Sequence, residues 1–247
     1  MADIERTLVE TFLKARRDGS PAETASLAPP PDAETAYRIQ TAVAAATGPI
    51  GAFKAGRGGP ALTMAPIRAA TVRESGATIP AAESRLRGVE LELAFRLTAP
   101  PPPVDAPDFE ERLAASVVLL PALEIVESRM TVFETADPLL KLADNVGNGG
   151  VVLGAPIADW RRLDLSRPDV RLAFAGETKR EGPSAPPGGD AFLTLVEFAR
   201  LAKDFCGGLQ AGQVVITGSL TGLLYAKAGD RIRGEIAGVG VVETLFA

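Results

Sequence analysis

The 247-residue sequence contains no histidine and a single cysteine, Cys206. Without histidine, Ser-His and Cys-His nucleophile systems, histidine general bases and the usual zinc sites are excluded. One cysteine cannot form an internal disulfide, and such low cysteine usage is typical of a reducing compartment, so we expect a cytoplasmic protein. The groups that remain for chemistry are carboxylates, lysine, arginine and hydroxyls.

A strong net charge and long apolar runs are also missing. The formal charge is −5 and no basic block occurs, which argues against a nucleic-acid partner. No apolar run reaches the roughly 18 residues of a membrane span, and residues 1–19 lack the apolar region of a signal peptide. Hydrophobic residues make up 46% of the chain, which is enough for a globular protein with a sizeable core.

The pattern of apolar residues predicts helices first and strands afterwards. Helical spacing runs through residues 3–18 and again after Asp32, which can cap a second helix. Short β-like runs bounded by Gly, Pro or Asp follow from about residue 78, and one further helix is expected at 191–205. The expected strands are 52–54, VELELAFRL, SVVLLPALEIVES, VVLGAPI, VRLAFAG, QVVITGSL and RIRGEIAGVGVVETLF.

These strands do not alternate regularly with helices, so a Rossmann-type parallel sheet fits poorly. We expect an α+β fold, built as a mixed β-roll with flanking helices. No internal repeat or long linker is visible, and residues 1–247 are therefore interpreted as one catalytic domain. In this interpretation residues 1–50 form a helical N-terminal segment and residues 51–247 a β-rich, metal-binding core.

Three glutamates stand out within the expected strands. Glu90 and Glu92 are two residues apart, so on a strand they point to the same side. Alternation of Glu with Leu is also what a half-exposed strand shows, and a solvent-facing pair remains an alternative. Glu124 follows a nearly unbroken apolar run, where an ionised carboxylate is costly unless it is paired or binds a metal.

For Glu124 the alternatives are an ion pair with Arg129 or Lys141, or exposure at the end of its strand. If the three carboxylates meet, their repulsion would be relieved by a hard, oxygen-preferring cation such as Mg²⁺. Lys54, in the segment GAFKAG, could neutralise an anionic substrate or act as an acid with a depressed pKa. A surface lysine in a turn is the alternative.

The order of several segments along the chain resembles the fumarylacetoacetate hydrolase superfamily, in its 2-keto-4-pentenoate hydratase and 4-oxalocrotonate decarboxylase branch. The resemblance runs almost from end to end. Its segments are AYRIQ at 36–40, GAFKAG at 51–56, SGATIP at 75–80, VELELAF at 89–95, PALEIVESR at 121–129, ADN at 143–145, VVITGSLTG at 214–222 and AGDRIRGEIAGVGVVETLF at 228–246.

The resemblance implies roles for the residues in these segments. Glu90, Glu92 and Glu124 match the family's ligands of Mg²⁺ or Mn²⁺, and Lys54 matches a lysine implicated in acid–base work or in orienting the substrate. It implies that Asn145 and the turn that contains Thr217 and Ser219 lie near the substrate. It also implies a homo-oligomer.

Two segments depart from the family pattern. Gly56-Arg57-Gly58-Gly59 stands where many relatives read GLTS, and 146–149 replaces a small, serine-containing stretch. Both segments contribute to the active site in the family. The implied metal site is therefore better supported than the identity of the substrate.

The activity that the resemblance implies is metal-dependent hydration of a 2-hydroxy-2,4-dienoate to a 4-hydroxy-2-oxo acid, in aromatic catabolism. Decarboxylation of a 4-oxalocrotonate-type diacid is the runner-up, because Arg57 could pair with a second carboxylate. Hydrolytic C–C cleavage fits less well, since the relatives that perform it use a histidine. A non-catalytic, metal-binding relative is the third alternative. The expected partner is a small 2-oxo or 2-hydroxy-dienoic acid.

Overall fold

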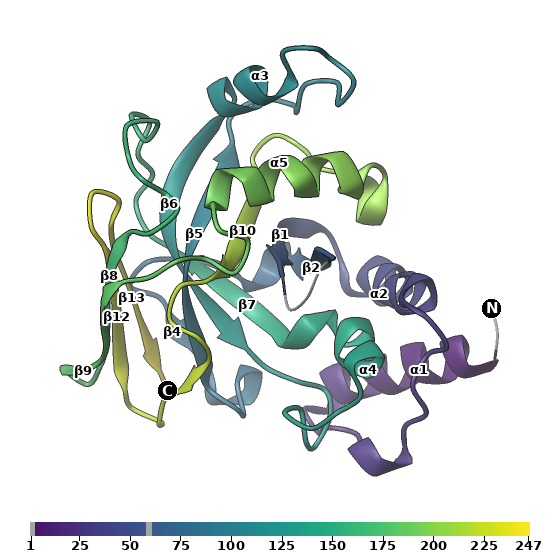
Figure 1. Ribbon diagram of the computed structural model, residues 1–247. Helices are drawn as coiled ribbons and strands as arrows, with labels where there is room; N and C mark the ends of the chain where they lie inside the picture. The colour runs from purple at the N-terminus through teal and green to yellow at the C-terminus, as the bar shows by residue number, and fades with distance from the viewer. Residues whose placement is uncertain (1–2, 58–60) are drawn as a thin grey trace.

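The computed structural model describes residues 3–57 and 61–247, and it has the expected α+β architecture (Figure 1). The α-helices are α1 (Asp3–Asp18), α2 (Ala33–Thr47), α3 (Phe109–Ala115), α4 (Pro138–Ala143) and α5 (Ala191–Ala202). Short 3-10 helices are η1 (Thr24–Ser26), η2 (Ala69–Thr71), η3 (Ala81–Glu83), η4 (Asn145–Gly147) and η5 (Phe205–Gly207). None of the helices in the described ranges has the length and apolarity needed to cross a bilayer.

The strands form two sheets. The larger has the order β2-β1-β10-β5-β6-β7-β3, with β11 beside β5, and the smaller has the order β4-β13-β12-β8-β9. The strands of the larger sheet are β1 (Ile50–Gly56), β2 (Thr63–Arg68), β3 (Val72–Glu74), β5 (Gly88–Leu97), β6 (Val117–Val126), β7 (Asn148–Leu153), β10 (Val214–Ser219) and β11 (Leu224–Tyr225). Those of the smaller sheet are β4 (Thr78–Ile79), β8 (Asp169–Phe174), β9 (Glu177–Pro183), β12 (Arg231–Ile236) and β13 (Gly240–Phe246).

The larger sheet curls, because β2 and β7 come into contact although other strands separate them in the order. Its inner face carries mostly small or branched apolar residues, among them Ala52, Ala94, Ala122 and Val151. Small side chains allow the opposite walls of a curled sheet to approach each other. The outer face and α5 enclose the main core together with the smaller sheet.

Local sequence explains where several elements begin and end. Asp32 caps α2 as expected, because its carboxylate accepts a hydrogen bond from the Thr35 amide at 2.7 Å. The helix expected over 191–205 is shorter than that: α5 ends at Ala202, where Lys203 turns to a left-handed φ of 40°. Strand β9 was not among the expected strands, since ETKREGP is a polar edge strand with almost no apolar signal.

The N-terminal helices form a smaller apolar cluster with α4. Gln40, on α2, is completely buried and donates hydrogen bonds to the backbone oxygens of Met64 and Leu142, at 3.1 and 2.5 Å. Figure 1 shows α1 and α2 side by side at the edge of the molecule, next to α4. One amide side chain thus connects the helical segment to β2 and to the end of α4.

Candidate metal centre

Antiparallel pairing of β5 with β6 brings the three glutamates together. Glu90 lies directly opposite Glu124 in the register of the two strands, and Glu92 follows on the same face of β5. Leu91 and Leu93 point to the other face and pack in the main core. One carboxylate oxygen of each glutamate lies within 4.8 Å of the others. Like charges placed this way destabilise a sheet unless something compensates them.

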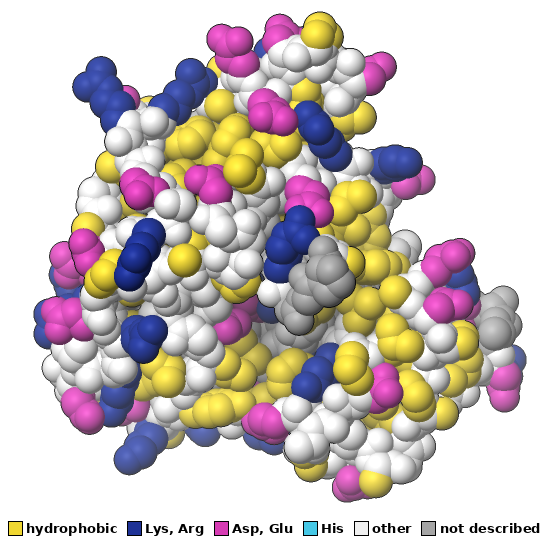
Figure 2. All heavy atoms as spheres, viewed as in Figure 1, with side chains coloured by type: hydrophobic (Ala, Val, Ile, Leu, Met, Phe, Trp, Pro, Cys, Tyr) yellow, Lys and Arg dark blue, Asp and Glu magenta, His cyan; other side chains and the backbone are white. Residues whose placement is uncertain are grey.

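Figure 2, viewed as Figure 1, shows a surface that is hollowed near its centre. Acidic and basic side chains border this hollow. Glu92 and Glu124 themselves are buried, with exposed fractions of 2% and 0%, whereas Glu90 is partly exposed. The carboxylate cluster therefore has one side within reach of small solutes.

Burial and mutual repulsion oppose ionisation of the cluster. Burial, and after it repulsion from Glu124, raises the pKa of Glu90, which also receives a hydrogen bond from the Ser219 hydroxyl. The same two causes raise the pKa of Glu92 well above its usual value, and Glu90 adds to the effect. A hydrogen bond of 2.7 Å from the Gly218 amide to Glu92 offsets only part of it.

Lys54 supplies the positive charge nearest to the cluster. Its Nζ donates to Glu124 Oε1 at 2.6 Å and to the Val146 carbonyl at 3.2 Å. The surface-lysine alternative is wrong, because the side chain is only 13% exposed. Burial lowers the pKa of Lys54, but the three carboxylates together raise it, and the net shift is upward. The expectation of a depressed lysine pKa is therefore wrong as well.

The donor set fits a hard divalent cation. Besides Lys54, the Asn148 amide donates to Glu124 Oε1 at 2.8 Å, whereas Glu124 Oε2 is buried and has no hydrogen-bond partner. A buried carboxylate oxygen without a partner is costly. One lysine also leaves three carboxylates with an excess of negative charge. Oxygen-only ligands of this charge suit Mg²⁺ or Mn²⁺.

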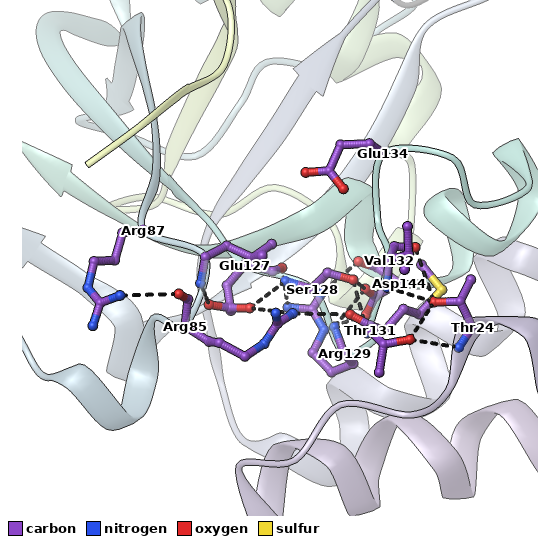
Figure 3. A network of polar contacts seen from close by, with 12 residues as sticks. Thr24, Arg85, Arg87, Glu127, Ser128, Arg129, Thr131, Val132, Glu134 and Asp144 are labelled. Atoms are coloured by element: carbon purple, nitrogen blue, oxygen red, sulfur yellow. Dashed lines mark hydrogen bonds and ion pairs between the residues drawn. The ribbon is translucent and has the colours of Figure 1, made fainter. Parts of the chain in front are cut away.

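The alternative ion partners considered for Glu124 are engaged elsewhere. Arg129 pairs with Asp144, whose carboxylate also accepts hydrogen bonds from the Ser128 hydroxyl at 2.8 Å and the Arg129 amide at 3.0 Å (Figure 3). Lys141 donates to the backbone oxygen of Glu134. The ion pairs of Glu124 with Arg129 or Lys141, considered as alternatives to metal binding, are therefore wrong.

The segment that follows α4 has an unusual backbone. Asn145 and Val146 both have left-handed φ angles, 54° and 51°, which are strained for a β-branched residue such as valine. In this conformation the Val146 carbonyl accepts a hydrogen bond from Lys54. Two residues later, the Asn148 side chain donates a hydrogen bond to Glu124. The departure from the family pattern at 146–149 thus lies against the site and contributes two contacts to it.

The remaining predicted site residues differ in how many of their polar atoms already have a hydrogen-bond partner. Asn145 is buried and donates to the Pro66 carbonyl at 3.1 Å, while its Oδ1 has no partner. The Thr217 hydroxyl donates to the Leu93 carbonyl at 2.9 Å, so only its lone pairs remain for a ligand. Ser219 contacts Glu90.

Arg57 forms an ion pair with Glu197 of α5. The two residues that follow it in the departing segment, Gly58 and Gly59, lie outside the described residues. Asn148 was not singled out from the sequence as a site residue. Its signal was a lone amide at the start of an apolar strand, and polar residues are common at strand ends without a function.

Comparisons with known proteins agree with this geometry. The family model described as fumarylacetoacetate (FAA) hydrolase C-terminal matches residues 41–247. A 2-keto-4-pentenoate hydratase of Paraburkholderia xenovorans (strain LB400) is 34% identical over 173 residues, which cover 68% of this chain and 62% of that protein. A 4-oxalocrotonate decarboxylase of a Pseudomonas species is 33% identical over 132 residues, covering 53% of this chain and 50% of the relative.

Among solved structures, 4-oxalocrotonate decarboxylase from Pseudomonas putida G7, complexed with magnesium and adipate, superposes with a TM-score of 0.80. The match covers 100% of this chain and 98% of that one, at 18% sequence identity. At this identity the likeness shows the fold alone. The aligned part of the chain spans less than two thirds of the length of the curated hydratase.

Proposed function

The chain belongs to the fumarylacetoacetate hydrolase family, and from this membership and the site geometry we propose that it is a divalent-metal-dependent hydro-lyase. It adds water to a 2-hydroxy-2,4-dienoate of the 2-keto-4-pentenoate type and forms a 4-hydroxy-2-oxo acid, a step of aromatic catabolism. The observation that carries the proposal is the trio Glu90, Glu92 and Glu124, with Lys54 bonded to its most buried member. A cytoplasmic homo-oligomer is part of this proposal.

Glu90, Glu92 and Glu124 are the residues that would hold Mg²⁺ or Mn²⁺. When bound, such an ion supplies Lewis-acid polarisation of the oxygens of a 2-oxo acid. The orphaned Oε2 of Glu124 and the raised pKa values of Glu90 and Glu92 support this assignment, since each reports negative charge that the protein leaves uncompensated.

We assign to Lys54 the roles of general acid and of stabilising negative charge on the substrate. Its upward-shifted pKa keeps the ammonium protonated at neutral pH, so it can hold a developing oxyanion or deliver a proton to the substrate. Its hydrogen bonds to Glu124 and Val146 fix the position of Nζ. Asn145, through its unpartnered Oδ1, and Ser219 are candidates for polar contacts with the substrate, and the hydrogen bond from Thr217 to the Leu93 carbonyl holds β10 beside β5.

Hydration is favoured over decarboxylation by the surroundings of Arg57. A 4-oxalocrotonate-type substrate carries a second carboxylate, and Arg57 is the cation we expected to receive it. Its guanidinium is paired with Glu197, which neutralises its charge. A substrate with one carboxylate needs no such cation.

The test is a comparison of two substrates on the purified protein. With Mg²⁺ or Mn²⁺, we expect loss of the ultraviolet absorbance of 2-hydroxypenta-2,4-dienoate, with a product heavier by one water, and no reaction after treatment with a chelator. Release of CO₂ from 4-oxalocrotonate at a higher kcat/KM would favour the decarboxylase. Metal binding without turnover of either acid would indicate the non-catalytic alternative.

A further inference from the structure

A cavity separate from the carboxylate cluster has a surplus of the opposite charge. It has a volume of about 130 Å³, and its charged lining consists of Arg16, Arg68, Arg85, Arg129, Glu83 and Glu127. We call it the arginine cavity. A narrower cavity shares Arg16, Arg68 and Gly149 with it and reaches Asn145 and Asn148. The arginine cavity is therefore bounded by α1, the end of β2, the end of β6 and the start of β7.

Two of its guanidinium groups have no protein partner. Neither Arg16 nor Arg68 forms a hydrogen bond through its side chain, or an ion pair, within residues 3–57 and 61–247. The Nε atom of Arg16 is shielded from solvent and is one of the buried polar atoms left unsatisfied. A buried donor in this condition costs free energy until an acceptor reaches it.

The acids of the cavity are engaged with other groups. Glu127 accepts hydrogen bonds from the Leu86 and Ser128 amides at 2.8 and 2.9 Å and lies 3.7 Å from Arg85. Glu83 is bonded to Arg73 at 2.7 Å. Glu83 attracts Arg68 at longer range, but the direct contacts of both acids are with groups other than Arg16 and Arg68.

Asp144 pairs with Arg129 and is also the acid that acts electrostatically on Arg16. Figure 3 shows Arg129 turned toward Asp144, with Glu127 and Ser128 beside them. Asp144 balances one of the three guanidinium groups of Arg16, Arg68 and Arg129, and two positive charges remain. The pKa of Arg16 is lowered by burial first and then by repulsion from Arg129, with Asp144 acting in the opposite direction. Burial and repulsion from Arg129 also lower the pKa of Arg68.

We propose that the arginine cavity binds a small, doubly charged oxyanion such as inorganic phosphate. A dianion would neutralise the two surplus charges and accept hydrogen bonds from the unpartnered guanidinium groups, which match the geometry of oxyanions. The volume is about ten times the roughly 10–15 Å³ that one water occupies on the same measure, so a compact oxyanion and several waters fit in the cavity.

Gly149 contributes to the room for this anion. A Cβ atom at Gly149 would lie 2.7 Å from the Glu127 Cβ, so a larger residue would force β6 and β7 apart. The same wall connects to the carboxylate cluster, since Arg129 Nη1 donates to the Asn148 carbonyl at 2.7 Å and the Asn148 side chain donates to Glu124. The anion therefore sits one residue away from a candidate metal ligand.

The experiment measures binding of inorganic phosphate to the full chain at constant ionic strength, by calorimetry and thermal melting, with chloride as the reference salt and without divalent cations. We expect saturable binding of one phosphate and a higher melting temperature. Arg16→Gln and Arg68→Gln should each weaken binding at least tenfold. Arg17→Gln, on the exposed side of the same helix, makes the same change of charge and should leave binding unchanged.

The melting temperature in chloride gives a second measurement on the same variants. In chloride, Arg16→Gln should melt at or above the wild-type temperature, because it removes a buried charge that lacks a partner. Phosphate stabilisation no greater than that of chloride, or equal in wild type and Arg16→Gln, would overturn the proposal. So would loss of self-association in Arg16→Gln without any phosphate effect, since an acidic side chain of a second copy would then fill the cavity.

Discussion

The carboxylate cluster and the arginine cavity carry surplus charge of opposite sign, and strand β6 leads from one to the other. In the cluster, three glutamates face one lysine, and at the cavity Arg16 and Arg129 act on one another and on a single aspartate, Asp144. Both leave a buried polar atom unpaired, Oε2 of Glu124 and Nε of Arg16. Asn148 connects them, through its carbonyl on one side and its amide side chain on the other.

The difference between the two regions is how each charge is held. The glutamates project from adjacent strands whose register is fixed by ten residue pairs, so their spacing is rigid. Arg16 and Arg68 belong to a helix and to a strand end that meet only in the tertiary structure. A rigid, repulsive set of oxygens suits a small cation of demanding geometry, whereas flexible guanidinium groups suit an anion that they can enclose.

The largest effect is expected from a substitution of Glu124 in the carboxylate cluster. Glu124→Gln keeps the shape of the side chain but removes the charge that is most buried, so turnover should fall to background. The rise in melting temperature caused by Mg²⁺ or Mn²⁺ should disappear too. Glu177→Gln, an exposed ion-pair residue, is the control and should respond to metal like the wild type. An unchanged metal response in Glu124→Gln would remove this residue from the site.

Removal of Lys54 tests whether the cluster and its lysine have separate functions. Lys54→Met should lower kcat by about 10²–10⁴-fold, the range for a lost general acid. Metal affinity should be retained, because the ammonium bonded to Glu124 competes with the metal for that carboxylate. Calorimetry with Mg²⁺ beside steady-state kinetics measures both, and Lys14→Met is an exposed control. Equal losses in both quantities would contradict the assignment.

Asp144→Asn removes the carboxylate that pairs with Arg129 beside the arginine cavity. Removing one partner of a buried ion pair leaves an uncompensated charge, and the free energy of unfolding should fall by about 3–5 kcal/mol. Asp144 also accepts hydrogen bonds from Ser128 and Arg129, so its replacement should lower the stability of the fold. Chemical denaturation measures this loss of stability directly. Asp3→Asn, in an exposed ion pair, should change stability little. A stability loss no larger than that of the control would show that Asp144 does not stabilise the buried arginines around it.

The smallest effect is expected at the residue between the two regions. Asn148→Ala removes the amide that holds Glu124 but leaves the backbone contact with Arg129. Metal affinity should fall by about 10–100-fold, as is typical when a residue that orients a ligand is lost. Phosphate binding should change little. If phosphate affinity falls as much as metal affinity, the two regions are one coupled site and not neighbours.

Much of the carboxylate side was predictable, because a strand has a period of two and a buried charge is rare. Glu90 and Glu92 were assigned to one face from their spacing, and the apolar run before Glu124 marked it as buried. The partner of Glu124 was not predictable in this way. Arg129 was nearer in sequence than Lys54, yet it pairs with Asp144, and no periodicity encodes which of two cations lies on the right face.

The segments without periodicity were also missed. Strand β9 is polar on both faces, α3 and α4 are too short for a helical pattern, and the left-handed turn at Asn145 and Val146 contains no glycine in those two positions to mark it. Their conformations depend on the neighbours they pack against. Local propensity is too weak to decide such segments.

The sequence by itself determined the chemistry that is open to this protein: no histidine, one lysine in a small-residue strand, and three carboxylates in apolar strands. It also determined the order of motifs that marks the family. Only the tertiary structure decided which charges meet, because the register of β5 on β6 and the meeting of Arg16, Arg68 and Gly149 around one cavity join distant parts of the chain. Electrostatic energy depends on distance and burial, and neither quantity exists until the chain has folded.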